Sequence, residues 1–129
     1  MYQIKPIQTK DEQAKICALC GVTYNADYLA YSATTGEGAL IGVCQFIMDD
    51  SAGHIYDLES APGADDFEAM YIMGRATLNF IDLCGIKTVY FEKPENELSR
   101  ALGFKCMENG KLAADLNGFF EHHCKDKEK

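Results

Sequence analysis

Three carboxylates, those of Asp65, Asp66 and Glu68, stand within four residues in the segment Ala61–Met70, APGADDFEAM. A helical pattern follows, and the start of a helix presents free backbone N–H groups and the positive end of the helix dipole. Such a place attracts anions, and here the chain supplies them itself. The favoured interpretation is helix capping, and the alternatives are a cation site or electrostatic exclusion of a phosphate-bearing ligand.

A C-x-x-C pair, Cys17 and Cys20, has a spacing that occurs in redox and zinc sites. A redox pair normally opens a helix, whereas this pair closes one, and a zinc site would need a second such pair. Further candidate ligands have no standard zinc spacing: Cys106, His122, His123 and Cys124. We therefore predict no metal site, and we expect the six cysteines to be reduced core thiols.

Acidic residues dominate the first half of the chain. The formal charge is −8, and no lysine or arginine occurs between Lys15 and Arg75. Nine carboxylates fall in that interval: Asp27, Glu37, Asp49, Asp50, Asp57, Glu59, Asp65, Asp66 and Glu68. Such a field repels nucleic acids and anionic membranes and attracts cations or amines. We expect neither a nucleic-acid nor a membrane partner.

The length of 129 residues, with 47% hydrophobic and 25% charged residues, predicts one globular domain over residues 1–124 and a charged tail, 125–129. No apolar run approaches the roughly 20 residues of a membrane span. The start, MYQIKPIQ, lacks the layout of a secretory signal. We expect a cytoplasmic protein.

The first half of the chain predicts an edge strand, a helix and three antiparallel strands. Residues 2–7 alternate weakly, and a helix follows from the cap Thr9 to the stop Gly21. Strand patterns then cover residues 28–33, 39–48 and 54–60, separated by turns. These three strands are the expected centre of the sheet.

The second half predicts a long helix over residues 66–84, with Asp65 as its N-cap and Gly85 past its end. A strand over residues 88–91, a short helix over 95–101 and a hairpin turning at Asn109–Gly110 complete the chain. The predicted order is β-α-β-β-β-α-β-α-β-β.

This order resembles that of the GCN5-related N-acetyltransferase (GNAT) family. Residues 4–16 resemble its opening strand and helix, Leu40–Cys44 is similar to its third strand, and Leu102–Phe104 matches its recurrent LGF. The resemblance implies an α/β (α+β) fold: a mixed, mainly antiparallel sheet of six to seven strands with helices on both faces. It also implies acetyl-CoA as co-substrate.

The phosphate-binding motif of that family is degenerate here. Aligned without gaps, the family's Arg or Gln position falls on Asp65, and its two glycines fall on Glu68 and Met70. The resemblance leaves the helix start, Glu68, Ala69 and Met70, as the place that would meet the cofactor. It also leaves the backbone of Leu58 and Ser60 to pair with the pantetheine arm.

The resemblance also suggests where acid and base would lie. Asp57 or Glu59, expected on one strand face with Ile55, would take the amine proton. The family's usual tyrosine acid is replaced by Ser99, a far weaker acid. Candidate substitutes are Tyr56, Tyr71 and Tyr90.

Two functions remain open. The first is a weak or atypical GNAT-like N-acetyltransferase that moves an acetyl group from acetyl-CoA to an amine of a small molecule or protein. The second is a catalytically inactive GNAT-like binding or regulatory module, for example a homodimer joined through an exposed strand.

Overall fold

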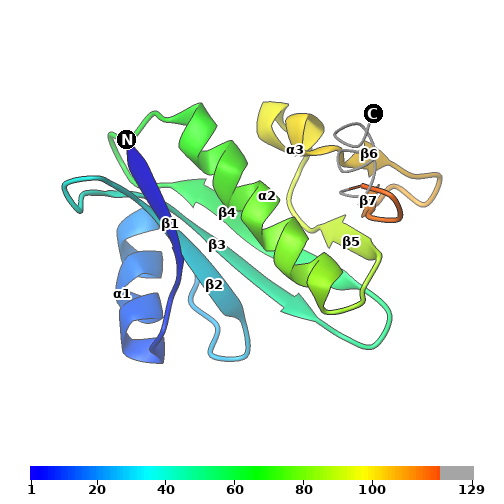
Figure 1. Ribbon diagram of the computed structural model, residues 1–129, viewed down its shortest axis with the longest axis horizontal. Helices are drawn as coiled ribbons and strands as arrows, with labels where there is room; N and C mark the ends of the chain where they lie inside the picture. The colour runs from blue at the N-terminus through cyan, green and yellow to red at the C-terminus, as the bar shows by residue number, and fades with distance from the viewer. Residues whose placement is uncertain (120–129) are drawn as a thin grey trace, which may run out of the picture.

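The computed structural model describes residues 1–119 and has the predicted order of elements (Figure 1). The strands are β1 (Tyr2–Pro6), β2 (Leu29–Thr35), β3 (Leu40–Met48), β4 (Gly53–Ser60), β5 (Thr88–Phe91), β6 (Lys105–Cys106) and β7 (Leu112–Asp115). The helices are α1 (Lys10–Cys20), α2 (Phe67–Leu83) and α3 (Glu97–Leu102). His122, His123, Cys124 and the predicted tail lie outside the described residues.

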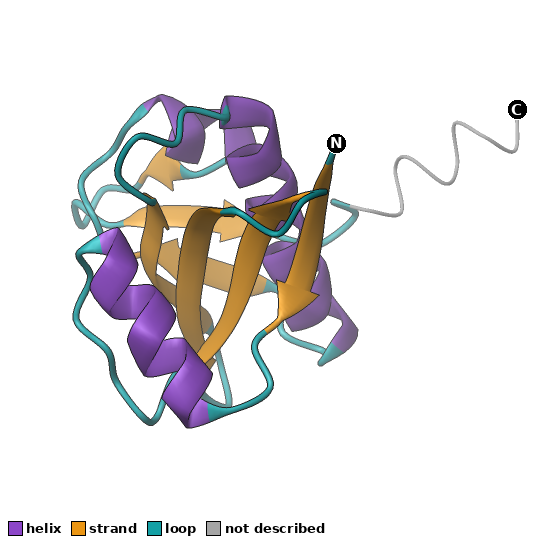
Figure 2. Ribbon diagram, turned by 90° about the vertical axis from the view of Figure 1, so that its left-hand side faces the viewer, coloured by secondary structure: helices purple, strands orange, loops and turns teal. Residues whose placement is uncertain are grey.

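One seven-stranded sheet has the order β1-β2-β3-β4-β5-β7-β6. All neighbouring strands are antiparallel except β4 and β5, which are parallel. The mixed, mainly antiparallel sheet and its antiparallel centre, β2-β3-β4, are therefore confirmed. Helix α1 covers one face and α2 the other (Figure 2), as predicted.

Each face of the sheet has its own apolar core. The larger core lies under α2 and includes Phe46, Ile55, Met70 and Met73, whereas Cys17 and Val43 belong to a smaller core under α1. Helix α2 approaches the sheet closely at Gly42, where an added Cβ would lie 2.7 Å from the carbonyl oxygen of Glu59 and would also clash with Met70. Met70 is therefore a core residue.

The helix ends follow the capping residues in the sequence. Thr9 accepts a hydrogen bond from the Glu12 N–H at 3.1 Å, and Gly21 ends α1 in the left-handed conformation. The prediction of Asp65 as the N-cap of α2 was wrong: the cap is Asp66, whose Oδ1 accepts from the Ala69 N–H at 3.0 Å. The turn Pro62–Gly63, closed by a bond from Ala64 N–H to Ala61 O, delays the helix by one residue.

A β-bulge lies in the middle of β4. Gln45 is opposite Asp57 while its neighbour Phe46 is opposite Ile55, so Tyr56 is an extra residue in the strand. The bulge resets the alternation of side chains. Ile55 packs in the core under α2, whereas Asp57 bonds to Gln45 on the α1 side. The expectation that Asp57 and Glu59 share a face with Ile55 was therefore wrong.

No helix within residues 1–119 has the length and apolar character that a bilayer span requires. All five cysteines in that part of the chain are free, and Cys17, Cys20 and Cys44 are buried. The expectation of reduced core thiols is confirmed for those three, while Cys84 and Cys106 are exposed.

Candidate functional site

The parallel strands β4 and β5 pair along only part of their length. The paired residues run from Gly53 with Val89 to Ile55 with Phe91, and the Glu92 N–H then donates to the Ile55 carbonyl at 2.8 Å. Beyond this point β4 keeps its pairing with β3 as far as Ser60, while the chain after β5 turns away toward α3. We call the place where the two strands part, after Ile55 and Phe91, the strand split.

Asp57 lies at the strand split and is only 6% exposed. Its Oδ2 accepts a hydrogen bond from Gln45 Nε2 at 2.8 Å. Its Oδ1 lies 3.6 Å from the ammonium nitrogen of Lys93, which comes from the segment after β5. One carboxylate oxygen is thus held by the sheet, and the other faces a cation from across the split.

A buried network of amides holds Asp57 in place. Gln45 is fully buried, and its Nε2 also donates to the Thr23 carbonyl at 2.9 Å. Its Oε1 accepts from Gln13 Nε2 of α1 at 2.9 Å. Gln13 is itself 2% exposed and also donates to the Tyr28 carbonyl at 3.2 Å. The network connects α1, the segment before β2, β3 and β4, so that the orientation of Asp57 depends on all four.

Aromatic rings form a row beside the split. Tyr28 stacks on Tyr56 with centroids 4.8 Å apart, His54 lies 6.2 Å from Tyr56, and Tyr90 lies 5.6 Å from His54. Burial, the nearby charge of Glu92 and the contact with Tyr28 raise the pKa of Tyr56. Its phenol is therefore protonated at neutral pH, as a proton donor must be.

Carboxylates flank the same row. His54 Nδ1 lies 2.7 Å from Glu92, and its Nε2 lies 3.2 Å from Asp49. The Lys111 ammonium stands over the Tyr90 ring, 5.2 Å from its centre. Rings and carboxylates together favour organic cations, because both the ring faces and the carboxylates attract positive charge.

The start of α2 offers little to an anion. Glu68 is exposed, the Ala69 N–H is occupied by the capping carboxylate of Asp66, and Met70 is 3% exposed in the core. Its first turn thus carries negative charge, which disfavours an anion there.

At Leu58 and Ser60 the groups available for contact with a ligand are those of the backbone and not the side chains. Leu58 is 4% exposed and packs in the core under α2, opposite Cys44 of β3. Ser60 is exposed and pairs with Gly42. Glu59 is exposed between them and lies near enough to Cys20 to raise its pKa, after the larger effect of burial.

Ser99 is committed to helix capping. It is fully buried, and its Oγ accepts from the Asn96 N–H at 3.0 Å and donates to the Asn96 carbonyl at 3.0 Å. Tyr71 packs against the core under α2. Of the predicted substitutes for the family's acid, Tyr56 and Tyr90 belong to the aromatic row, and Tyr56 is next to Asp57 in the chain.

The Cys17 and Cys20 thiols lie in the core under α1. Burial, followed by the charge of Asp57, raises the pKa of Cys17 to about 11. A thiol with such a pKa is protonated at neutral pH and is a poor nucleophile.

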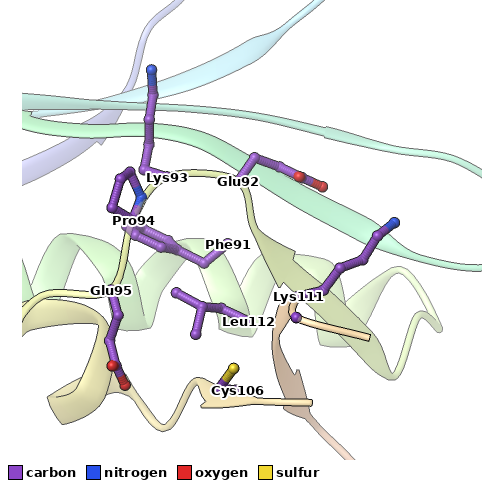
Figure 3. A pocket seen from close by; sticks show the side chains of 9 residues that line it. Phe91, Glu92, Lys93, Pro94, Glu95, Cys106, Lys111 and Leu112 are labelled. Carbon is purple, nitrogen blue, oxygen red and sulfur yellow. The ribbon is translucent and has the colours of Figure 1, made fainter. Parts of the chain in front are cut away.

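A cavity of about 340 Å³ lies beside the strand split. It is lined by Phe91, Glu95, Cys106, Lys111 and Leu112, among others (Figure 3). In Figure 3 the Lys93 side chain extends away from Phe91 and Leu112, on the side opposite Cys106. This orientation agrees with its contact to Asp57.

Sequence reasoning missed Gln13, Gln45 and Lys93. A lone amide inside the apolar run LIGVCQFIM was a usable signal for Gln45, because a buried polar side chain must find partners. Lys93 gave no such signal, since its contact with Asp57 joins positions 36 residues apart in the chain.

No family model and no curated protein matches the sequence, but many solved structures match the fold. The IAA acetyltransferase of Bacillus cereus is 18% identical, with a TM-score of 0.71 over 90% of this chain and 100% of that one. The ribosomal-protein-S18-alanine N-acetyltransferase of Escherichia coli is 14% identical, with a TM-score of 0.67 over 90% of this chain and 94% of that one. Mutant forms of the spermidine/spermine N-acetyltransferase of Vibrio cholerae are 11% identical, with a TM-score of 0.70 over 95% of this chain and 99% of that one.

These similarities extend over nearly the whole length of both chains, while the sequence identities are too low to carry a function. Together with the element order, the parallel pair β4–β5 and the helices on both faces, they establish that the chain has the GNAT fold.

Proposed function

We propose that this protein transfers an acetyl group from acetyl-CoA to an amine. The observation that carries the proposal is the buried carboxylate of Asp57, held by Gln45 at 2.8 Å where β4 and β5 part. A buried, oriented carboxylate beside an open strand edge is suited to take the proton that an ammonium must lose before its nitrogen can attack a thioester.

The strand split suits the pantetheine part of the co-substrate. Between Asp57 and Ser60, β4 pairs with β3 on one side, and β5 no longer pairs with it on the other. An extended amide-containing arm would add to that edge through backbone hydrogen bonds at Leu58 and Ser60, whatever side chains these residues carry. Acetyl-CoA would supply the activated acetyl group there.

The start of α2 does not suit the pyrophosphate. Each close like-charge contact costs about 1 kcal/mol or more, depending on the local dielectric, which corresponds to roughly a fivefold to tenfold loss of affinity. Backbone groups at Glu68, Ala69 and Met70 would meet the phosphates only against the charges of Asp66 and Glu68. We therefore propose an affinity for acetyl-CoA below that of an enzyme with a basic residue and glycines there.

The proposed acceptor is cationic, a small-molecule or protein amine, because the aromatic row that includes Tyr56, the neighbour of Asp57 in the chain, is flanked by carboxylates. The neighbouring folds include N-acetyltransferases for spermidine and for a ribosomal-protein alanine, which are amines of both classes. A dodecameric form of the spermidine enzyme is also among them, and we propose a homo-oligomer, at least a dimer, here. The free cysteines favour the cytoplasm as its location.

The first test is binding. At 100 times its dissociation constant acetyl-CoA stabilises the folded state by about 2.7 kcal/mol, so the melting temperature should rise clearly. Calorimetry would give the affinity, and dephospho-CoA and pantetheine thioesters would show which part of the molecule is recognised. Absence of any shift would favour the inactive binding or regulatory module, which the capping roles of Asp66 and Ser99 also support.

The second test is turnover. Release of the CoA thiol is measured with a polyamine and with an alanine-starting peptide as acceptors. The variant Asp57→Asn should lower turnover by about 100-fold, the usual contribution of a general base. Glu59→Gln, two positions along the same strand and exposed, is the matched control and should change turnover less than about twofold. Equal losses in both variants would contradict the assignment of Asp57.

A further inference from the structure

Lys93 presents an amine to Asp57 from the opposite side of the strand split. Its Nζ lies 3.6 Å from Asp57 Oδ1, and its side chain is 46% exposed. The backbone fixes the start of its segment, because the Glu92 N–H donates to the Ile55 carbonyl at 2.8 Å. The two partners thus lie on β4 and on the segment after β5, the two parts of the chain that separate at the split.

The geometry of this pair is that of an acceptor amine and its base. The free oxygen of Asp57, Oδ1, faces the ammonium, while Gln45 holds Oδ2. We propose that Lys93 is an acetylation site that the protein modifies on itself, in the same molecule. The inference rests on the proposed function, because the acetyl group must come from acetyl-CoA bound at the split.

The chemical step balances as follows. Asp57 Oδ1 takes a proton from the Lys93 ammonium, directly or through a water molecule. The freed Nζ then bonds to the carbonyl carbon of the acetyl thioester, and the carbon–sulfur bond breaks with its electron pair going to sulfur. The nitrogen loses a second proton, which passes to the sulfur, so that the CoA thiol leaves and an N-acetyl-lysine remains. Asp57 releases the first proton to solvent. No oxidant or reductant is required.

Acetylation would change the site as well as the side chain. The amide of acetyl-lysine carries no charge, so Asp57 would lose the cation that faces Oδ1. The modified chain would then have a carboxylate open to an external amine. A free ammonium at Lys93 competes with such an amine for the same oxygen.

Lys87 provides a matched internal control. Its side chain is 43% exposed, close to the 46% of Lys93, and it also forms an ion pair with an aspartate, Asp82. That pair joins the end of α2 to the segment before β5, away from the strand split. Non-enzymatic acetylation by a thioester depends on exposure and local charge, so it should affect the two lysines alike.

The experiment incubates the full chain with acetyl-CoA and no added amine, and follows the intact mass and the acetylated peptides over time. Lys93 should be acetylated about 100-fold faster than Lys87, with a rate constant independent of protein concentration. Lys93→Arg keeps a cation opposite Asp57 and should abolish the fast phase only. Asp57→Asn should slow the acetylation of Lys93 to the rate of Lys87. Circular dichroism checks that this variant remains folded.

Several results would overturn the inference. Equal rates at Lys93 and Lys87 would show a plain ion pair, and a rate constant that rises with protein concentration would show transfer between molecules. Thiol release with an external amine but no acetyl group on Lys93 would refute self-acetylation and leave the proposed function intact. If acetyl-CoA did not bind and no thiol were released, both the self-acetylation of Lys93 and the proposed function would be refuted.

Discussion

The start of α2 and the strand split both carry aspartates, yet the two regions use them differently. Asp66 satisfies one backbone donor on the surface of a helix end. Asp57 is 6% exposed and bonds to an amide that is itself fully buried. Capping requires only an oxygen within reach of an N–H group, whereas burying a carboxylate requires partners on several elements. Asp57 has buried partners on several elements and Asp66 does not, and for this reason we propose the split as the functional region.

The strongest test of this difference removes the support of Asp57. Gln45→Leu keeps the volume but leaves Asp57 Oδ2 and Gln13 Nε2 without their buried partner. Loss of such a partner costs about 3 kcal/mol or more in the free energy of unfolding. Urea denaturation measures it, and Gln3→Leu on the exposed side of β1 is the control, expected within about 0.5 kcal/mol of the parent. If Gln45→Leu lowered the free energy of unfolding no more than Gln3→Leu does, the amide network would not be needed to hold Asp57.

The next test separates capping from ligand exclusion at α2. Asp66→Ala should lower the free energy of unfolding by about 1 kcal/mol through loss of the cap, and it should raise the affinity for acetyl-CoA by up to about tenfold. Asp65→Ala is the neighbouring control, and its effect on stability should stay within about 0.5 kcal/mol. A stability loss with no gain in affinity would leave capping as the sole role of Asp66.

The smallest effect concerns Glu68. Glu68→Gln removes one exposed charge and should raise the affinity for acetyl-CoA about threefold, with the gain shrinking as salt is added. The loss of its favourable contact with the helix dipole costs about 0.3 to 1 kcal/mol. Asp11→Asn in the first turn of α1, on the other face of the sheet, is the control for affinity. Calorimetry at two salt concentrations measures the affinity of both variants for acetyl-CoA. An equal gain in affinity in both would show that net charge, and not the position of Glu68, causes the effect.

Local signals in the sequence predicted most of the fold. Thr9 and Gly21 bound α1 as predicted, and the Asn109–Gly110 turn joins β6 to β7, because capping and turn formation depend on neighbouring residues. The N-cap of α2 was placed one residue early, since Asp65 and Asp66 are chemically equal and only the preceding turn distinguishes them.

The site was only partly predictable. Asp57 was named from the strand pattern and the family resemblance, and Leu58 and Ser60 from their place on the same strand. The face of Asp57 was assigned wrongly because a bulge at Tyr56 shifts the alternation, and no local residue signals that extra position. The pairing of Asp57 with Gln45 depends on the register of β3 against β4.

By itself, the sequence determined the order of the elements, the caps and turns, and the acidic character of the first half, because each of these depends on composition or on residues a few positions apart. The tertiary structure decided which carboxylate is buried, which amide holds it and which lysine faces it. Those contacts join α1, β3, β4 and the segment after β5, and they exist only once the sheet has formed.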